Sequence, residues 1–312
     1  MEIKKPIFII GVPRTGTTLL LNILCFHPDL AWFSTENFPE WASEDEKEKM
    51  KKHFLELKKN HKKIPISEES LFVFGPNWSK GIAQTKVHSD LKKIPIEGEF
   101  FWRKQFGDKY IKDISDDKKQ VIISELEKLV KEQKKSRFLS KAPQNTMRLF
   151  AIKKIFPDVK FVNVVRDPRA VVYSMLQRHK AEGFFNPGIK ILDKEKFDKL
   201  ELIEQFAWSY KEMTEGIYKF STANKNNLLT ISYEDLIFET RKIIIKILKY
   251  CELDIPHNID QMIPPIRTHR DDWKKNLSKR QQQKIFDLTK PSMKKMNYPY
   301  KQSLIYWFLG KI

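Results

Sequence analysis

The chain has 312 residues, 41% of them hydrophobic and 12% aromatic, which is enough for a sizeable core. No apolar run approaches the roughly 20 residues of a membrane-spanning helix, and two cysteines are too few for a disulfide framework. The net charge of +18 suits a polyanionic ligand or acceptor, nucleic acid, or simply a solvated lysine-rich surface. Charge alone does not choose among these.

The chain reaches its first predicted strand within six residues, which leaves no room for a signal peptide or membrane anchor. Cys25 and Cys251 both follow apolar helical patterns and are expected to be buried thiols. We therefore expect a cytoplasmic protein without a membrane span. No Gly/Ser-rich or Pro-rich linker divides the sequence, so residues 1–312 are expected to form a single domain.

The first structural signal is a strand, a glycine-bracketed turn and a helix. Ile7–Ile10 is a short apolar run typical of a strand buried on both faces, and Leu19–Cys25 is apolar nearly all round, as in a buried helix. Between them lies Gly-Val-Pro-Arg-Thr-Gly-Thr-Thr, residues 11–18. The glycine spacing is that of a Walker A phosphate-binding loop, but Thr17 stands at the lysine position. Arg14 is the nearest substitute cation, and we predict a phosphate cradle.

After the first helix, the sequence predicts a turn, a second strand and then an irregular region. His27-Pro28-Asp29 predicts a turn, and the strand 30–33 ends at Ser-Thr-Glu-Asn, which places Glu36 on the same rim as the phosphate loop. Residues 43–63 predict a charged helix, and 64–117 form an irregular stretch rich in proline and aromatic residues. We expect residues 43–117 to be a helical and irregular insertion or an acceptor-site lid.

The remaining sequence alternates helices and strands. Helix 118–135 should bury Val121 along with four other apolar residues, Ile122, Leu126, Leu129 and Val130. Strands are predicted at 137–140 (ending at Lys141), 159–165 and 228–231, and helices at 143–156, 168–180, 195–221, 241–250 and 278–295. This alternation predicts an α/β fold with a doubly wound, mainly parallel sheet.

A second anion site is predicted where the strand 159–165 ends. Arg166, Ala170 and Ser174 are spaced to share one face of the following turn and helix, which favours a phosphate pocket. Asp167 is either a Walker B ligand of Mg²⁺ or, because Pro168 follows, a helix N-cap. The plainer alternative pairs Arg166 with a surface carboxylate and Ser174 with its own helix. Two anion pockets on one sheet suit a nucleotide phosphorylated at both ends.

These two motifs resemble those of the sulfotransferases that use 3′-phosphoadenosine 5′-phosphosulfate (PAPS). Residues 11–18 look like the 5′-phosphosulfate loop of that family, and 165–174 like its 3′-phosphate motif. Shorter segments agree in order: Ser-Thr-Glu at 34–36, Ser-Lys-Ala-Pro at 140–143 and Ile-Ser-Tyr-Glu-Asp-Leu at 231–236. The branch of tyrosylprotein and bacterial carbohydrate sulfotransferases is the most similar, and the resemblance implies the P-loop sulfotransferase fold.

The resemblance also implies roles for individual residues. The 5′-phosphosulfate would be held by Arg14, Thr15, Gly16, Thr17 and Thr18, and the 3′-phosphate by Arg166 and Ser174. Tyr233 would lie beside the nucleotide, Lys141 would be a cation near the transferred sulfuryl group, and Glu36 would be the general base. Histidine is the base in the cytosolic branch, so His88 stays open as a rival, whereas His27 in its tight turn is expected to be structural.

The implied activity is O-sulfotransfer from PAPS to an acceptor hydroxyl by in-line displacement, releasing 3′,5′-ADP without a metal. The acceptor, whether glycan, lipid, phenol or tyrosine peptide, stays open, and so does a homodimer; the lack of a membrane anchor argues against a tyrosine peptide. One alternative is a degenerate P-loop kinase or NTPase that binds ATP with Mg²⁺. The other is a basic nucleic-acid-binding domain, which we do not expect because no recognition helix is evident.

Overall fold

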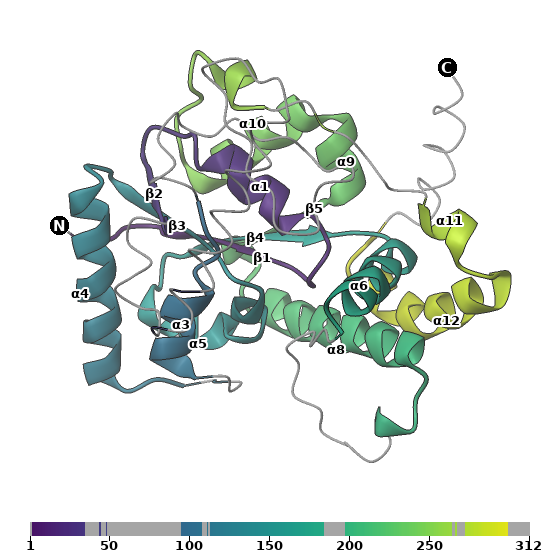
Figure 1. Cartoon of the computed structure of the whole chain (residues 1–312). Helices are drawn as coiled ribbons and strands as arrows, with labels where there is room; N and C mark the ends of the chain where they lie inside the picture. The colour runs from purple at the N-terminus through teal and green to yellow at the C-terminus, as the bar shows by residue number, and fades with distance from the viewer. Residues whose placement is uncertain are drawn as a thin grey trace.

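The computed structural model describes residues 2–34, 44, 48, 95–107, 111, 113–183, 197–263, 266 and 272–298. Within these ranges a sheet of five parallel strands is flanked by helices on both faces (Figure 1). The strands are β1 (Ile7–Ile10), β2 (Leu30–Trp32), β3 (Arg137–Lys141), β4 (Lys160–Val165) and β5 (Leu228–Ser232). The predicted doubly wound α/β fold is confirmed.

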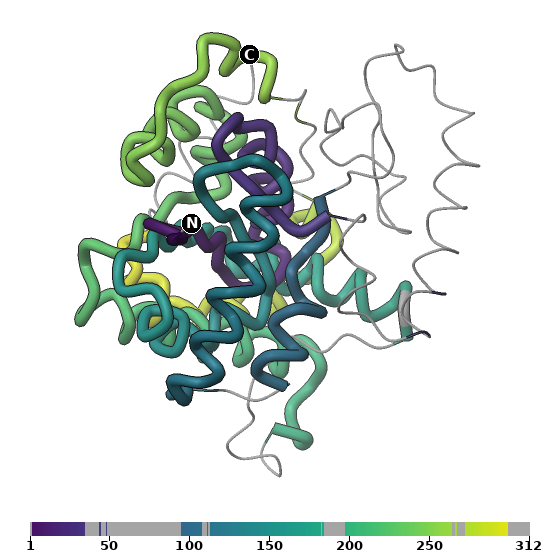
Figure 2. The backbone as a smooth tube through the Cα atoms, turned by 90° about the vertical axis from the view of Figure 1, so that its left-hand side faces the viewer, coloured from purple at the N-terminus to yellow at the C-terminus, as the bar shows by residue number. Residues whose placement is uncertain are grey.

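Strand β1 shows how the sequence builds the two layers. Successive side chains of a strand point to opposite faces, so Ile7 and Ile9 enter one core while Phe8 and Ile10 enter the other. The first face is covered by α1 (Thr17–Leu24), α9 (Tyr233–Phe238) and α10 (Thr240–Cys251). Figures 1 and 2 both show α1 (purple) beside the green α9–α10 region, although the two are far apart in the sequence.

The opposite face carries more helices. It is covered by α3 (Glu99–Phe106), α4 (Asp116–Glu132), α5 (Leu149–Ile155) and α8 (Leu202–Ala223). Against α8 pack α6 (Pro168–Glu182) and α12 (Lys279–Lys295), and α11 (Asp272–Asn276) packs against α6; these helices share a separate apolar cluster. Short 3₁₀ turns complete the described elements: η3 (Pro143–Met147), η4 (Lys225–Asn227) and η5 (Ile259–Met262).

The strand order β2-β3-β1-β4-β5 creates the position for a site. The chain runs from β1 toward one edge through β2 and β3, and then to the other side of β1 through β4 and β5. In open α/β sheets, ligands bind beyond the carboxyl ends of the strands at such a reversal. Here that point lies at the end of β1, where the glycine loop begins, between Lys141 on β3 and Arg166 after β4.

Several boundaries follow from local signals read in the sequence. The Asp167 side chain accepts a hydrogen bond from the backbone N–H of Arg169 at 2.9 Å, so it caps α6 as expected, with Pro168 at the first helical position. Ser278 caps α12 within a reciprocal capping box with Gln281. Both cysteines are free and buried, as predicted.

Two expectations about local structure and packing were wrong. The predicted helix 143–156 is divided at Arg148 into η3 and α5, because the backbone of Arg148 leaves the helical region (φ −116°). The buried Arg148 guanidinium donates to the carbonyl of Gly107 at 2.6 Å. Val121 on α4 is 50% exposed rather than buried. Within the predicted insertion or lid, residues 43–117, α3 buries Phe101 and Trp102 in the main core.

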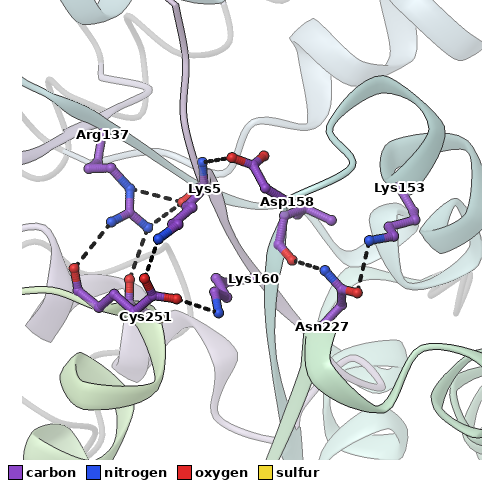
Figure 3. Close-up of polar contacts among 9 residues, drawn as sticks. Lys5, Arg137, Lys153, Asp158, Lys160, Asn227 and Cys251 are labelled. Atoms are coloured by element: carbon purple, nitrogen blue, oxygen red, sulfur yellow. Dashed lines mark hydrogen bonds and ion pairs between the residues drawn. The ribbon is translucent and has the colours of Figure 1, made fainter.

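At the amino ends of the strands, polar groups are paired with one another (Figure 3). Arg137 donates to the backbone carbonyls of Lys5 and Cys251, the latter at 3.1 Å. Glu252 pairs with Lys5 and with Lys160, the latter at 2.8 Å. Asn227 donates to the carbonyl of Val159 at 2.7 Å. These contacts tie the strand beginnings to the end of α10 and make this edge structural.

No helix among the described residues is long and apolar enough to cross a membrane. Residues 35–43, most of the predicted helix 43–63 and the segment 64–94 lie outside the described residues.

Candidate functional site

The loop after β1 has the backbone of an anion cradle. Gly11 and Gly16 have positive φ values of 148° and 100°, and Arg14, although it carries a side chain, has φ 77°. The backbone N–H and hydroxyl of Thr15 both donate to the carbonyl of Val12, at 3.2 and 2.8 Å, which closes a tight turn. Left-handed residues within such a turn leave backbone N–H groups directed inward, and α1 adds its unpaired N-terminal donors.

Gly16 is required for a second reason, the close approach of Tyr233. A Cβ atom on Gly16 would lie 2.4 Å from the Tyr233 ring. The same ring carries the Arg166 guanidinium at 4.2 Å from its centroid, a cation–π contact. Tyr233 at the end of β5 therefore joins the glycine loop to the loop after β4.

The two predicted phosphate motifs touch one another. Arg166 donates to the backbone carbonyl of Arg14 at 3.1 Å, and Nε of Arg14 donates to Oγ of Ser174 at 3.0 Å. Arg166 and Ser174 thus lie beside the glycine loop, although more than 150 residues separate them from it. Nε of Arg166 is buried and has no hydrogen-bond partner among the described residues. A buried donor held this way is normally satisfied by water or a ligand.

Lys141 enters the site from the end of β3, next to β1. Its side chain is only 5% exposed, and its ammonium group forms an ion pair with Glu97, whose side chain is 36% exposed. The same carboxylate oxygen of Glu97 accepts a hydrogen bond from the hydroxyl of Thr18 at 3.1 Å. Partial burial acts to raise the pKa of Glu97, but Lys141, Thr18 and Arg14 outweigh it and hold that pKa below its usual value.

Asp167 has the contacts of a helix cap. Its carboxylate accepts hydrogen bonds from Nε and a terminal nitrogen of Arg169, at 3.0 and 2.6 Å, in addition to the backbone N–H of Arg169. The Arg169 guanidinium also stacks on the Trp273 ring at 4.2 Å. Both carboxylate oxygens are therefore engaged by one arginine, which favours the N-cap interpretation over the Walker B one. The described residues contain no cluster of three His, Cys, Asp or Glu side chains suited to a metal.

Glu234 is a buried acid directly behind the Arg166 loop. One of its oxygens accepts a hydrogen bond from the backbone N–H of Asp167 at 3.2 Å, and its carboxylate also has a side-chain hydrogen bond with Tyr298. Burial raises the pKa of Glu234 to about 7, despite the opposing attraction of Arg166. At neutral pH this group is therefore partly protonated, unlike an ordinary surface carboxylate.

The structure brings together most of the residues singled out from the sequence. Arg14, Gly16, Thr18, Lys141, Arg166, Ser174 and Tyr233 are linked by the contacts above, and Thr17 is buried in the first turn of α1. The hydroxyl of Thr15 donates to the carbonyl of Val12 and so shapes the loop. Glu36 and its rival His88 lie outside the described residues.

His27 is structural, as expected. Its Nδ1 accepts the backbone N–H of Asp29 at 3.2 Å, so Nε2 is the nitrogen that donates to the carbonyl of Asp254, at 2.9 Å. The side chain is buried and serves the turn after α1.

Two residues at the site were missed by the sequence analysis. Glu97 lies in a segment without helical or strand periodicity, 44 residues before Lys141, so no local pattern pairs the two. Trp273 comes from a basic stretch near the C-terminal end whose only signal was a lone aromatic residue among charges. Both contacts depend on tertiary structure.

Comparison with known proteins gives one consistent result. Residues 6–258 match the model of the sulfotransferase family. A curated relative from Caenorhabditis elegans, named "Putative protein-tyrosine sulfotransferase", is 27% identical over 121 residues, which cover 38% of this chain and 40% of the relative. The match therefore spans less than half the length of that relative.

Solved structures share the fold. Sulfotransferase STF9 from Mycobacterium avium superposes with a TM-score of 0.56 at 15% identity, covering 92% of this chain and 76% of that one. Sulfotransferase STF1 from Mycobacterium tuberculosis gives a TM-score of 0.53 at 16% identity with the same coverage, 92% and 76%. At these identities the likeness is one of fold.

Proposed function

The chain belongs to the sulfotransferase family, and from that premise we propose that it transfers a sulfuryl group from PAPS to an acceptor hydroxyl. The family membership makes it a sulfotransferase; the donor, the residue roles and the acceptor class are the proposal.

One observation carries the choice of donor: the glycine loop and the Arg166 loop touch one another. Arg166 donates to the carbonyl of Arg14, and Arg14 donates to Ser174. Two anion-binding loops in contact, at the ends of adjacent strands β1 and β4, suit a single small ligand with phosphate at two positions. A nucleotide with 3′ and 5′ phosphates has this character. ATP, with one phosphate chain, would use only the first loop.

We assign the residues accordingly. The backbone N–H groups of residues 16–18, with the Arg14 guanidinium, would hold the 5′-phosphosulfate. Arg166 and Ser174 would hold the 3′-phosphate, and Tyr233 would support Arg166 beside the nucleotide. Thr15 would act through the shape of the loop. Lys141 and the hydroxyl of Thr18, which already share one anionic partner, would face the sulfuryl group.

In the proposed reaction the acceptor hydroxyl oxygen forms a bond to sulfur while the bond from sulfur to the bridging 5′-phosphate oxygen breaks. The departing phosphate gains negative charge, so Arg14, Lys141 and the loop N–H groups favour the transition state, each such contact being worth about 10²–10³ in rate. The hydroxyl proton passes to a general base, for which Glu36 is our candidate and His88 the rival.

Calorimetric titration of 3′,5′-ADP in the presence of EDTA tests the donor class. We expect saturable one-to-one binding that EDTA leaves unchanged, and weaker binding of ATP with or without Mg²⁺. Tight ATP binding that requires Mg²⁺ would instead indicate a P-loop kinase or NTPase. Salt-sensitive binding of nucleic acid that excludes 3′,5′-ADP would indicate the third class.

The acceptor needs a separate screen with radiolabelled donor against glycans, lipids, phenols and tyrosine peptides. The C. elegans relative gives tyrosine peptides a place in that screen. Transfer to one class, abolished by Glu36→Ala with binding of 3′,5′-ADP intact, would support Glu36 as the base. Normal turnover by Glu36→Ala would show that another residue is the general base.

A further inference from the structure

Glu97 stands among groups that the proposed function reserves for an anion. Its carboxylate oxygen Oε1 is shared by the ammonium group of Lys141 and the hydroxyl of Thr18, the latter at 3.1 Å. Arg14 contributes a further attraction. A carboxylate in contact with a lysine and a threonine hydroxyl resembles one edge of a sulfuryl group, which carries the same kind of negatively charged oxygens.

The backbone around Glu97 fixes it at this place. The N–H of Ile96 donates to the carbonyl of Phe33 at 2.9 Å, and the N–H of Gly98 donates to the carbonyl of Lys141 at 2.9 Å. A Cβ on Gly98 would lie 2.4 Å from the Phe33 ring, so the chain passes very close to the end of β2. The segment is thus pinned on both sides of Glu97, while the Glu97 side chain remains 36% exposed.

The burial of the two partners is unequal, and this decides which of them moves. Lys141 is 5% exposed and extends from a central strand, whereas Glu97 is 36% exposed and lies on a connecting segment. A buried ammonium group is costly without a partner charge. An incoming anion that reaches Lys141 can replace Glu97 at no loss of pairing, because the carboxylate can turn toward water.

We propose that Glu97 is an internal placeholder for the sulfuryl group of the donor: its carboxylate occupies Lys141 and Thr18 in the free enzyme, yields them when the donor binds, and returns to them once the sulfuryl group has been transferred. This inference rests on the proposed function. It makes Glu97 a positioning residue that lowers the affinity for the sulfated donor relative to the desulfated product, and so eases exchange of product for donor.

The neighbouring acid Glu99 provides a matched control. It lies two residues away and its carboxylate accepts a hydrogen bond from Gln144 at 2.6 Å. Burial, together with the charge of Glu97, raises the pKa of Glu99, whereas that of Glu97 is lowered. Among the contacts of the described residues, Glu99 makes no hydrogen bond to Lys141 or Thr18. Replacing either acid by glutamine removes one potential negative charge near the loop, but only the replacement of Glu97 removes the charge that is paired with Lys141.

The test measures the dissociation constants of PAPS and of 3′,5′-ADP for the wild type, Glu97→Gln and Glu99→Gln, without acceptor. We expect Glu97→Gln to tighten PAPS binding by about tenfold, a size usual for coupling between two ligands, and to change the affinity for 3′,5′-ADP by less than about twofold. Glu99→Gln should leave the ratio of the two affinities unchanged. Because glutamine can still accept a hydrogen bond from Lys141, Glu97→Ala is measured as a second variant, after its thermal unfolding shows that it folds. It should also tighten PAPS binding and leave the affinity for 3′,5′-ADP nearly unchanged.

The outcomes separate the two proposals. Weaker PAPS binding by the Glu97 variants would show that Glu97 only holds Lys141 in place. An equal gain in affinity for PAPS and 3′,5′-ADP would show only a general effect of removing a negative charge. Either outcome overturns the placeholder role of Glu97 and leaves the donor assignment standing. A wild type that binds neither nucleotide would overturn the donor assignment and the placeholder with it.

Discussion

The two ends of the parallel sheet use the same kinds of residue in opposite ways. At the amino ends, the Arg137 guanidinium donates hydrogen bonds to backbone carbonyls, and Glu252 forms ion pairs with Lys5 and Lys160 (Figure 3). At the carboxyl ends, Nε of Arg166 is buried without a hydrogen-bond partner among the described residues, and Glu234 is buried beside it with a raised pKa. The first end gains stability from satisfied polar groups, whereas the second holds hydrogen-bonding capacity in reserve for a ligand.

The largest difference is expected between two lysines on β3 and β4, the strands on either side of β1, each lysine being paired with a glutamate. Lys141→Met removes the cation at the end of β3 and should lower kcat by about 10²–10³. Lys160→Met removes a partner of Glu252 at the beginning of β4 and should leave kcat within about twofold, because this ion pair lies at the opposite end of the sheet from the two anion-binding loops. Steady-state kinetics with a fixed acceptor measures both. Comparable losses in the two variants would erase the distinction.

The acids of the two ends should respond oppositely to pH. The pKa of Glu234 is raised by burial to about 7, from an ordinary value of 4.5. The unfolded chain therefore loses this proton first, and Glu234 should make the protein less stable as pH rises from about 4.5 to 7, by about 3 kcal/mol. Chemical unfolding at a series of pH values should show this decline in the wild type and its absence in Glu234→Gln.

Glu252 supplies the control for that experiment. Hydrogen bonds from Lys160 and Lys5 lower its pKa to about 2, so its contribution is present above pH 4.5 and is lost as pH falls toward 2. In Glu252→Gln, the free energy of unfolding should depend less on pH below about 4.5 and should keep its decline between about pH 4.5 and 7. If Glu234→Gln instead changed the pH dependence of the unfolding free energy below about pH 4.5, the contrast between the two ends of the sheet would be wrong.

Two arginines should separate binding from stability. Arg166→Ala is expected to weaken 3′,5′-ADP by about 2 kcal/mol, roughly 30-fold in Kd, because a charge-assisted contact to phosphate is lost. Arg137→Ala should leave Kd unchanged but lower the free energy of unfolding by about 1–3 kcal/mol, since several backbone carbonyls lose their donor. Calorimetric titration gives the Kd of 3′,5′-ADP for each variant, and urea unfolding gives the free energy of unfolding of each. A loss of binding in Arg137→Ala would count against the assignment.

The smallest difference within a pair is expected between two glycines of positive φ, Gly16 and Gly183. Gly16→Ala forces an alanine into φ 100° and drives its Cβ to 2.4 Å from the Tyr233 ring, for which we expect a loss of about 2–3 kcal/mol in stability. Gly183→Ala at φ 71° has open space around the added carbon and should cost only about 1 kcal/mol, the backbone penalty. Thermal unfolding compares the two. Equal shifts would mean that the loop does not hold Tyr233 tightly.

The contrast also explains what could be predicted from the sequence. The strand, loop and helix spanning residues 7–24 were predicted because the apolar run, the glycines and the following helix are local signals. The cap at Asp167 was equally local. Arg148, where the predicted helix divides, makes a contact with Gly107, 41 residues away, and Phe101 is buried by strands that are distant in the sequence. No periodicity encodes such contacts.

The candidate site divides in the same way. Arg14, Arg166 and Ser174 were found because each belongs to a motif that follows a recognisable strand. Glu97 follows no regular element, and its function depends on reaching Lys141 and Thr18 across the fold. The base assigned to Glu36 rests on sequence resemblance alone.

The central claim is that the glycine loop and the Arg166 loop grip a single nucleotide phosphorylated at both ends. A crystal structure of the chain with 3′,5′-ADP measures this directly. The account predicts the 5′-phosphate on the N–H groups of residues 16–18 with Arg14, and the 3′-phosphate on Arg166 and Ser174. A nucleotide that contacts only one of the two loops, or that lies away from the carboxyl ends of β1 and β4, would contradict it.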